Sequence, residues 1–403
     1  SSDQVCLDSV SNSQPHQINF SSQYVPAYSN DTGNNGQSYN FPSQFLWEIS
    51  GDGITTNDYS FVNGSSDSDP YPVIDFYSFG DYIITTTVTG DCGVSDSNTF
   101  AYSINEIPSI TNPDSDFQQT LCSAESTDLI EFQSSMENTT FTWSYSSADT
   151  YLSGYNSQTS NTGNLLPQQI FNSNNISGQV IFQVTPSTED CEGETRSITI
   201  TVNPVPSIEN IEQEVCTGSG IAITPSDGTI PSGTTYSWDA PTSSPSGAIT
   251  GGNSGTDETT ITESELLNST NSPAVLTYTV TPTTPDGCTG DPFTVSVTVN
   301  PLGQVDNPGD QEFCNNDNIS INFTTDNTGG DTTYSWTNTN SAIGLSNSGS
   351  GNINVTATNT TNDPITSTVT VTPSFEGCEG TPQTFTITVN PVPSIENIEQ
   401  EVC

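Results

Sequence analysis

Apolar residues alternate with Thr or Ser along many short segments of the chain. Residues 293–299, for example, read Phe-Thr-Val-Ser-Val-Thr-Val. A period of two predicts a β-strand with one buried face. Clusters of Pro, Gly, Asn and Asp lie between these segments and predict turns. Only residues 263–267 have the pattern of a short helical turn, so we expect an all-β protein.

This pattern repeats along the chain. Residues 199–216 read TITVNPVPSIENIEQEVC, and residues 386–403 have the same 18 letters. Shared landmarks between the two copies show that the true period is about half their separation, so several similar domains follow one another. We expect domains at residues 1–106, 107–204, 205–301 and 302–390, with residues 391–403 beginning a fifth repeat.

Each unit carries the same landmarks in the same order. An opening cysteine is followed by one Trp, a Val-Thr strand end, a closing cysteine and a final alternating strand, which Asn-Pro ends in units two to four. The opening cysteines are Cys6, Cys122, Cys216 and Cys314, and the closing cysteines are Cys92, Cys191, Cys288 and Cys378. Several short strands within roughly 95 residues predict an immunoglobulin-like β-sandwich in each unit. One Trp per sandwich is typical of a core residue, and sugar stacking is the alternative role.

The cysteines allow three interpretations. A metal site needs clustered cysteines, and none occur in the sequence. A redox site needs a thiol close to cations, and no cation is near in sequence. Disulfides remain, and we expect one within each unit, in the pairs Cys6–Cys92, Cys122–Cys191, Cys216–Cys288 and Cys314–Cys378. They imply an oxidising, extracytoplasmic compartment.

These bonds are expected at one end of each domain. The opening cysteine lies where the chain enters, and the closing cysteine lies in the loop before the last strand. We therefore expect a staple at the junction with the preceding domain, which would keep the first strand from peeling away under tension. Cys403, the ninth cysteine, is expected to open the fifth repeat.

The charge balance excludes two classes of partner. The 403 residues include 47 Asp and Glu but only one Lys or Arg, which is Arg196, and the formal net charge is -46. Nucleic-acid binding needs cations that neutralise phosphates, and docking onto anionic membranes needs them too. No run of 18 apolar residues occurs, so we expect no direct membrane insertion. The first residues lack the pattern of a signal peptide, which is consistent with processing or with a start inside a longer chain.

The segments between the units are short, Pro-containing and acidic. Pro favours extended backbone, so we expect a semi-rigid rod. The acidic residues of these segments are Asp114, Asp116, Glu209, Glu212, Glu214, Asp306, Asp310 and Glu312. They make Ca²⁺ a candidate cofactor between domains. Solvated acidic loops are the alternative, and the spacing matches no known Ca²⁺ loop.

Several motifs carry a family resemblance. The third unit combines Tyr236-Ser237-Trp238, Tyr278 to Pro282, Cys288-Thr289-Gly290 and Val297 to Pro301. In these it resembles the PKD-like repeats of giant Bacteroidetes surface proteins. That family includes the gliding-motility adhesins of SprB type, which the type IX secretion system exports. Residues 47–53 of the first unit also resemble the PKD element Trp-x-x-x-Gly-Asp-Gly.

The resemblance implies a structural role at a bacterial outer-membrane surface. We expect a stalk or filament segment of a repetitive adhesin that mediates attachment or gliding, with further repeats of the same polypeptide as partners and an unidentified external surface or glycan as ligand. The alternative is a polysaccharide-binding or spacer module of a secreted carbohydrate-active enzyme. Catalysis within the chain is not expected, because a Ser/His/Asp site would depend on His16, which only one unit has.

Overall fold

The computed structural model describes residues 3–8, 10, 14–20, 44–90, 93 and 95–393. The chain forms two compact units, residues 1–172 with 177–203, and residues 173–176 with 204–403. Each unit contains two hydrophobic cores, one per β-sandwich. No helix in the described ranges is long and apolar enough to cross a membrane.

The first unit contains two sandwiches. The strands of the first sandwich are β1 (Asp3–Leu7), β2 (His16–Asn19), β3 (Gln44–Ser50), β4 (Tyr59–Val62), β5 (Val73–Phe76), β6 (Gly80–Thr89) and β7 (Ser95–Glu106). The second sandwich contains the 3-10 helix η2 (Asp114–Phe117) and strands β8 (Gln118–Cys122), β9 (Thr140–Ala148), β10 (Leu152–Ser153), β11 (Asn161–Thr162), β12 (Phe171–Asn172), β13 (Gly178–Ser187) and β14 (Arg196–Asn203).

The second unit contains the other two sandwiches. The strands of the third are β15 (Ser207–Ile208), β16 (Ile211–Cys216), β17 (Ser219–Ile223), β18 (Gly228–Thr229), β19 (Thr235–Trp238), β20 (Thr242–Ser244), β21 (Ile249–Thr250), β22 (Gly255–Glu258), β23 (Ile261–Asn268), β24 (Ala274–Thr283) and β25 (Phe293–Asn300). The fourth has β26 (Gln311–Cys314), β27 (Asn318–Ile321), β28 (Thr332–Asn338), the 3-10 helix η3 (Ser341–Ile343), β29 (Ser348–Ser350), β30 (Ile353–Thr356), β31 (Ile365–Phe375), β32 (Cys378–Glu379) and β33 (Gln383–Asn390).

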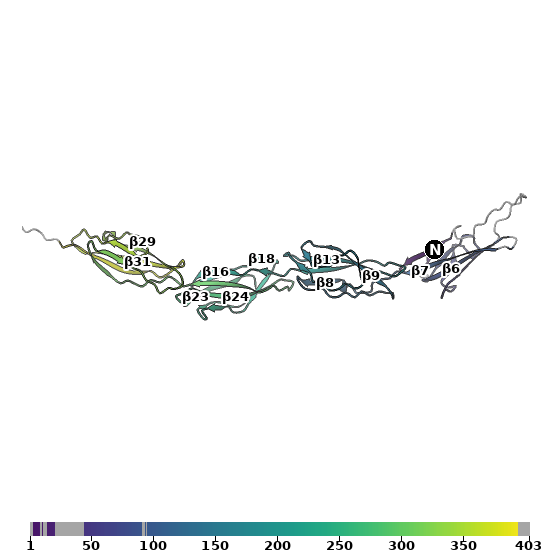
Figure 1. Ribbon diagram of the computed structural model, residues 1–403, viewed down its shortest axis with the longest axis horizontal. Helices are drawn as coiled ribbons and strands as arrows, with labels where there is room; N and C mark the ends of the chain where they lie inside the picture. Colours follow the sequence, from purple (N-terminus) through teal and green to yellow (C-terminus); the bar gives the residue numbers. More distant parts are fainter. Residues whose placement is uncertain are drawn as a thin grey trace, which may run out of the picture. The chain divides into compact units, whose positions relative to one another are not determined.

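All four sandwiches share one strand arrangement in their larger sheet. The opening strand (β1, β8, β16 or β26) pairs in parallel with the last strand (β7, β14, β25 or β33). The last strand pairs antiparallel with the strand before it, and that strand pairs with the strand that carries the Trp. In the third sandwich β23 and β24 belong to two different sheets. Figure 1 labels both strands. The chain is therefore an all-β protein of tandem immunoglobulin-like sandwiches.

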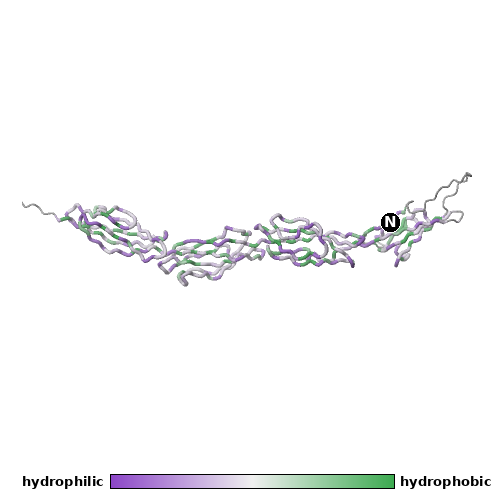
Figure 2. Tube along the Cα trace, viewed as in Figure 1, coloured by the Kyte–Doolittle hydropathy of each residue, from purple (hydrophilic) through white to green (hydrophobic). Residues whose placement is uncertain are grey.

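The cores contain the apolar positions of the alternating pattern. Along β25 the Val side chains at 295, 297 and 299 are buried, whereas the Thr and Ser residues between them are partly exposed. Hydrophilic and hydrophobic positions alternate in this way along many strands (Figure 2). The sequence-based expectation for residues 263–267 was wrong, because they form part of β23. Buried Ile261 and Leu266 belong to the core there, so tertiary packing overrides a weak local helical preference.

Each Trp is a core residue. Trp47, Trp143, Trp238 and Trp336 are between 3% and 8% exposed. Two of them are covered by a glycine directly across the sheet. Gly349 is the register partner of Trp336, and a Cβ built on this glycine would lie 2.1 Å from the indole Cζ2. Gly255 covers Trp238 in the same way, with a distance of 2.4 Å.

A buried carboxylate stabilises the loop that follows β21. Glu263 is 4% exposed and accepts hydrogen bonds from the Asn253 backbone N–H and side-chain amide, each at 2.8 Å. The Tyr278 hydroxyl donates a third bond at 3.0 Å. Burial and the adjacent Glu263 raise the pKa of Tyr278. Asn253 in turn accepts the Trp238 indole N–H through its carbonyl oxygen, so this network connects the loop to the core.

The packing of Gly349 against the Trp336 ring leads to a first prediction. Gly349→Ala should destabilise the fourth sandwich by about 1–3 kcal/mol, because the added methyl group overlaps the indole ring and forces the edge strand outward. Thermal unfolding measured by calorimetry checks this. The matched control is Ser350→Ala on the same strand, where the side chain is exposed. Equal effects from both substitutions would contradict the packing explanation.

Candidate functional site

The opening cysteines occupy one structural position. In the parallel register, Cys6, Cys122, Cys216 and Cys314 lie opposite Asn105, Asn203, Asn300 and Asn390, respectively. Each of these Asn residues is at or next to the C-terminus of the last strand. The opening cysteine is therefore at the end of the sandwich where the chain leaves, which we call the outgoing end.

The closing cysteines lie at the opposite end, which we call the incoming end. Cys191, Cys288 and Cys378 belong to the hairpin that precedes the last strand. Each is followed two residues later by a glycine whose backbone N–H donates to the carbonyl oxygen of Pro186, Pro282 or Pro373, respectively. In the third sandwich, for instance, Gly290 N–H bonds Pro282 at 2.9 Å.

The glycine of each Cys-x-Gly hairpin also lets the incoming linker pack against it. A Cβ on Gly193 would lie 1.9 Å from the Pro108 carbonyl oxygen, and one on Gly290 would lie 2.1 Å from that of Pro206. Gly380 has the same relation to Gly303, at 1.7 Å. Real side chains never come so close to backbone, so only glycine fits at this position. The contact holds the closing cysteine beside the segment that arrives from the preceding sandwich.

Two disulfides join one sandwich to the next. Cys6 of the first sandwich is bonded to Cys191 of the second, with 5.7 Å between their Cα atoms. Cys216 of the third is bonded to Cys378 of the fourth, with 5.5 Å between their Cα atoms. Both bonds connect the opening cysteine of one sandwich to the closing cysteine of the following sandwich. They close loops of 185 and 162 residues, which in the chain-entropy model stabilise the fold by about 5 kcal/mol each.

The expected pairing within each sandwich was therefore wrong. The bond Cys6–Cys191 replaces the predicted pairs Cys6–Cys92 and Cys122–Cys191. The bond Cys216–Cys378 replaces Cys216–Cys288 and Cys314–Cys378. The physical reason is the length of the last strand. Its eight residues in β25 span about 25 Å between the two ends of the sandwich, whereas bonded cysteines need Cα atoms about 4–7 Å apart.

The remaining cysteines differ in state. Cys122 is the opening cysteine of the second sandwich, and Cys288 is the closing cysteine of the third. Both are disulfide-bonded as well. Cys314, which we expected to be bonded, is a free and exposed cysteine. Cys92 and Cys403 lie outside the described residues.

The junction in the second unit has polar contacts in addition to its disulfide. The Asn271 carbonyl oxygen of the third sandwich accepts the Thr328 backbone N–H of the fourth at 3.0 Å. The Asn271 side chain accepts from Gln304 Nε2 at 2.9 Å, and the Ser272 and Thr328 hydroxyls are 2.6 Å apart. In the first unit, Gln4 Nε2 donates to Asp190 beside the Cys6–Cys191 bond, at 3.3 Å. Both of these junctions are thus held by polar groups as well as by a disulfide.

Arg196 fixes the linker at the start of the second sandwich. Its guanidinium forms an ion pair with Asp114, donates to the buried Asn112 carbonyl oxygen at 2.9 Å, and lies 4.3 Å from the centroid of the Phe117 ring. The side chain is 28% exposed, whereas that of Asp114 is 94% exposed. The contacts to Asn112 and Phe117 are therefore stronger than the exposed ion pair.

The acidic residues of the linkers mostly act as hydrogen-bond acceptors. Asp116 accepts from Asn112, Glu214 from Asn300 and Glu312 from Asn390. Asp306 accepts from Thr324, and Asp310 accepts from the Thr386 backbone N–H at 2.8 Å, which lowers the pKa of Asp310. In the described ranges no three or more His, Cys, Asp or Glu side chains come together as a metal site. The candidate Ca²⁺ sites therefore find no ligand cluster in this part of the chain.

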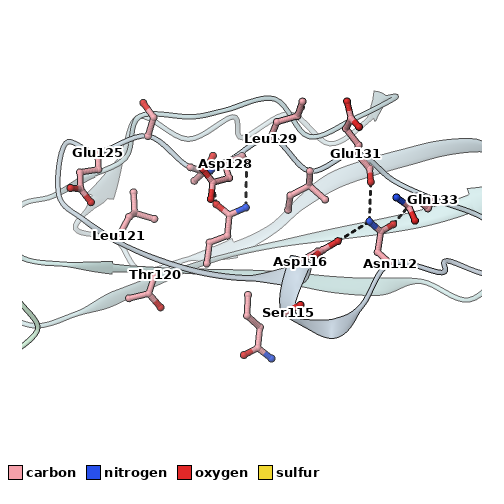
Figure 3. A pocket seen from close by; sticks show the side chains of 15 residues that line it. Asn112, Ser115, Asp116, Thr120, Leu121, Glu125, Asp128, Leu129, Glu131 and Gln133 are labelled. Atoms are coloured by element: carbon pink, nitrogen blue, oxygen red, sulfur yellow. Dashed lines mark hydrogen bonds between the residues drawn. The ribbon is translucent and has the colours of Figure 1, made fainter.

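A polar groove of about 730 Å³ lies between η2 and the segment 125–133 of the second sandwich. Asn112 and Gln119 form hydrogen bonds with other residues of its lining (Figure 3). Asn112 Nδ2 donates to Asp116 and to the Glu131 carbonyl oxygen, and its Oδ1 accepts from the Gln133 backbone N–H. Gln119 and Asp128 are joined by two hydrogen bonds. These polar groups are satisfied without a ligand, so the groove gives no argument for a binding site.

The Trp residues and His16 are the candidates that the sequence offers for sugar stacking and for catalysis, respectively. The indole rings are almost fully covered, so they offer no open face on which a sugar could stack. His16 lies on β2, and its Nε2 is 2.8 Å from the Tyr102 hydroxyl. Burial lowers the pKa of His16. Tandem sandwiches of this kind are typically structural, non-catalytic modules.

Peptide mapping tests the junction disulfides. Digestion of the oxidised chain with an acid-specific protease should yield one cross-linked peptide pair that contains Cys6 and Cys191 and another that contains Cys216 and Cys378, because the Cα atoms of these pairs lie 5.7 and 5.5 Å apart. Mass spectrometry without reduction identifies the pairs, and a reduced sample is the control. Recovery of Cys6–Cys92 or Cys216–Cys288 would overturn the assignment.

Substitution of Arg196 tests its three contacts. Arg196→Gln should destabilise the second sandwich by about 1–2 kcal/mol, because the buried Asn112 carbonyl loses its donor and Phe117 loses the cation above it. Asp114→Asn is the matched control and should cost less than about 1 kcal/mol, since Asp114 is almost fully exposed. Chemical denaturation measures both. Equal losses would show that the ion pair alone matters.

A comparison with protein families agrees with this architecture. A family model described as PKD-like domain matches residues 119–206, 213–303 and 311–393, more than half of the chain. No curated protein matches the sequence significantly. Among solved structures, the I-band fragment I67-I69 of titin has a TM-score of 0.38 and 10% identity, over 74% of this chain and 95% of that chain. Drosophila N-cadherin EC1-4 has a TM-score of 0.28 and 11% identity, over 97% and 99% of the two chains. The structural similarities are too low to carry an argument. The three sequence matches establish that the chain belongs to the PKD-like domain family.

Proposed function

We propose that this chain is a stalk segment of a bacterial cell-surface adhesin, which transmits tension between the cell and an external surface or glycan during attachment or gliding. The observation that carries the proposal is the disulfide between consecutive sandwiches. Disulfides within each domain would stabilise the folded state equally well, so stability alone does not explain bonds between domains. A bond from one domain to the next adds continuity along the chain.

The extracellular setting follows from the sulfur chemistry. Structural disulfides form and persist in oxidising compartments, so the chain is extracellular or secreted. The outer-membrane surface and export by the type IX system are the further steps of our proposal. They are supported by the resemblance to Bacteroidetes surface repeats, whose Lys-poor composition the chain shares.

The path of tension through the chain supports a mechanical role. A pull applied at the two ends of the chain enters β1 and reaches Cys6, and the Cys6–Cys191 bond passes it directly to Cys191. Residues 7–190 lie outside this covalent path. The same holds for residues 217–377, which the Cys216–Cys378 bond bypasses. Even if the sandwiches between bonded cysteines unfold, the chain cannot lengthen through those residues.

Single-molecule pulling tests this mechanical role. Cys6→Ser with Cys191→Ser should increase the releasable length, by at most about 600 Å, because up to 185 residues join the extensible path at about 3.3 Å each. The bond Cys216–Cys378 remains in this variant and serves as an internal control, since its own length appears only after reduction. Equal extension of the parent chain and the double variant would refute the proposal.

The surface location needs a separate test. Intact cells that produce the full-length protein should bind an antibody against this segment without permeabilisation, and removal of the segment should reduce attachment of the cells to a surface. Permeabilised cells provide the control for expression. Labelling that requires permeabilisation would contradict the cell-surface role, whereas the junction chemistry would be unaffected.

A further inference from the structure

We propose that the outgoing end of the fourth sandwich is a docking site for a further PKD-like domain, and that Cys314 forms a disulfide with the closing cysteine of that domain. The inference concerns the junction alone and does not depend on the adhesive function. It rests on a detailed match between this end and the outgoing end of the third sandwich, which is occupied in the structure by the fourth sandwich.

The first part of the match is the cysteine and its surroundings. Cys314 lies opposite Asn390 in the parallel register, as the bonded Cys216 lies opposite Asn300. The Asn390 side chain donates to Glu312, as the Asn300 side chain donates to Glu214. The same strand pairing and the same side-chain bond therefore hold both cysteines in place. One of them is bonded to the next sandwich, and the other is free and exposed.

The second part of the match is the loop next to each cysteine. Residues 268–273 read Asn-Ser-Thr-Asn-Ser-Pro, and residues 359–364 read Asn-Thr-Thr-Asn-Asp-Pro. In both loops the first Asn donates to two backbone carbonyls. Asn268 donates to Ser272 at 2.8 Å and to Val299 at 2.7 Å, and Asn359 donates to Asp363 at 2.9 Å and to Val389 at 2.7 Å. The two loops are thus held in the same shape.

The first of these loops shows what the second is able to bind. In the third sandwich, Asn271 contacts the fourth through its carbonyl oxygen and its side chain. Asn362 has the equivalent position in the fourth sandwich and is exposed. The loop also adjoins the cysteine, because the Asn315 side chain accepts the Asn359 backbone N–H at 2.8 Å, as Thr217 accepts that of Asn268 at 2.8 Å. Cys314 and Asn362 thus have the positions in the fourth sandwich that Cys216 and Asn271 have at the occupied junction.

The sequence identifies the occupant. Residues 391–403 repeat residues 204–216, which begin the third sandwich. The partner is therefore a PKD-like domain that continues the same polypeptide. Its required features are those seen on the incoming ends in the structure: a Cys-x-Gly hairpin packed against the linker, and a neighbouring backbone N–H that donates to Asn362 as Thr328 donates to Asn271.

The bond forms by ordinary thiol oxidation. The two thiols release two protons and two electrons as their sulfur atoms join, and a disulfide oxidant such as oxidised glutathione takes up both and becomes two thiols. The exchange proceeds through a mixed disulfide that the second thiolate attacks. Docking of the loop raises the local concentration of that thiolate and so selects the partner.

An extended chain tests the proposal. Residues 217–301 are added after Cys403, so that the repeat continues with the sequence of the third sandwich. Both the original and the extended chain are oxidised in a glutathione buffer and treated with iodoacetamide, and their peptides are mapped by mass spectrometry. Cys314 should be alkylated in the original chain and bonded to the copy of Cys288 in the extended chain. Recovery of the Cys216–Cys378 pair in both shows that the preceding junction is intact.

Two variants of the extended chain separate the bond from the docking surface. Cys314→Ser should leave the copied Cys288 alkylated and the other bonds unchanged. Asn362→Trp should lower the effective concentration of the Cys314–Cys288 pair about tenfold in a graded redox buffer, because the loop can no longer dock. The matched control is Thr360→Ala in the same loop. The equivalent residue of the third sandwich, Ser269, donates to the Ala248 carbonyl oxygen of its own sandwich.

Three outcomes would overturn the proposal. Cys314 could remain alkylated in the extended chain, which would show that the outgoing end does not bring the partner cysteine within reach. It could bond only glutathione or the Cys314 of a second molecule, which would show an accessible thiol without a docking site. The copied Cys288 could pair with Cys403, the opening cysteine of its own domain, which would show that this junction differs from those in the structure.

Discussion

The parallel pairing of the opening strand with the last strand is the constraint on which the rest of this structure depends. Because the opening strand runs in the same direction as the last strand, its C-terminal cysteine lies at the far end of the sandwich. Cys216 is therefore beside Asn300 and far from the hairpin of Cys288. A disulfide within the sandwich is then geometrically impossible. The cysteine is instead presented to the next domain, whose own hairpin is held against the linker by a glycine, as at Gly380.

The scarcity of cations shapes the remaining contacts. With one Arg and no other strong base in the chain, carboxylates near the junctions obtain their hydrogen bonds from amides and backbone N–H groups. These bonds are neutral on the donor side, so they depend little on ionic strength compared with surface ion pairs. Arg196 lies where a cation stabilises the fold most, between a buried carbonyl oxygen and the face of an aromatic ring.

Much of the fold could be predicted from the sequence, because period-two patterns report directly on which face of a strand is buried. The Val residues of β25 and the Trp of each sandwich were assigned to the core from the sequence. The cysteine pairing could not be predicted, because the pattern does not state whether the first strand runs parallel or antiparallel to the last. The role of Cys-x-Gly was visible as a repeat, but only the contact between Gly290 and Pro206 explains it. The predicted helical turn at 263–267 failed because Leu266 packs in the core of a strand.

The Cys6–Cys191 bond also constrains how the protein matures. Cys92 and Cys122 both lie between its two cysteines in the sequence. An oxidase that joined thiols in the order in which they leave the secretion channel would pair Cys6 with Cys92. The native bond requires that two successive sandwiches fold and meet before their thiols are oxidised, or that an isomerase corrects the first pairing. The positions of the cysteines in the sequence therefore determine the order of folding and oxidation. The native bond is in place only after neighbouring domains have assembled.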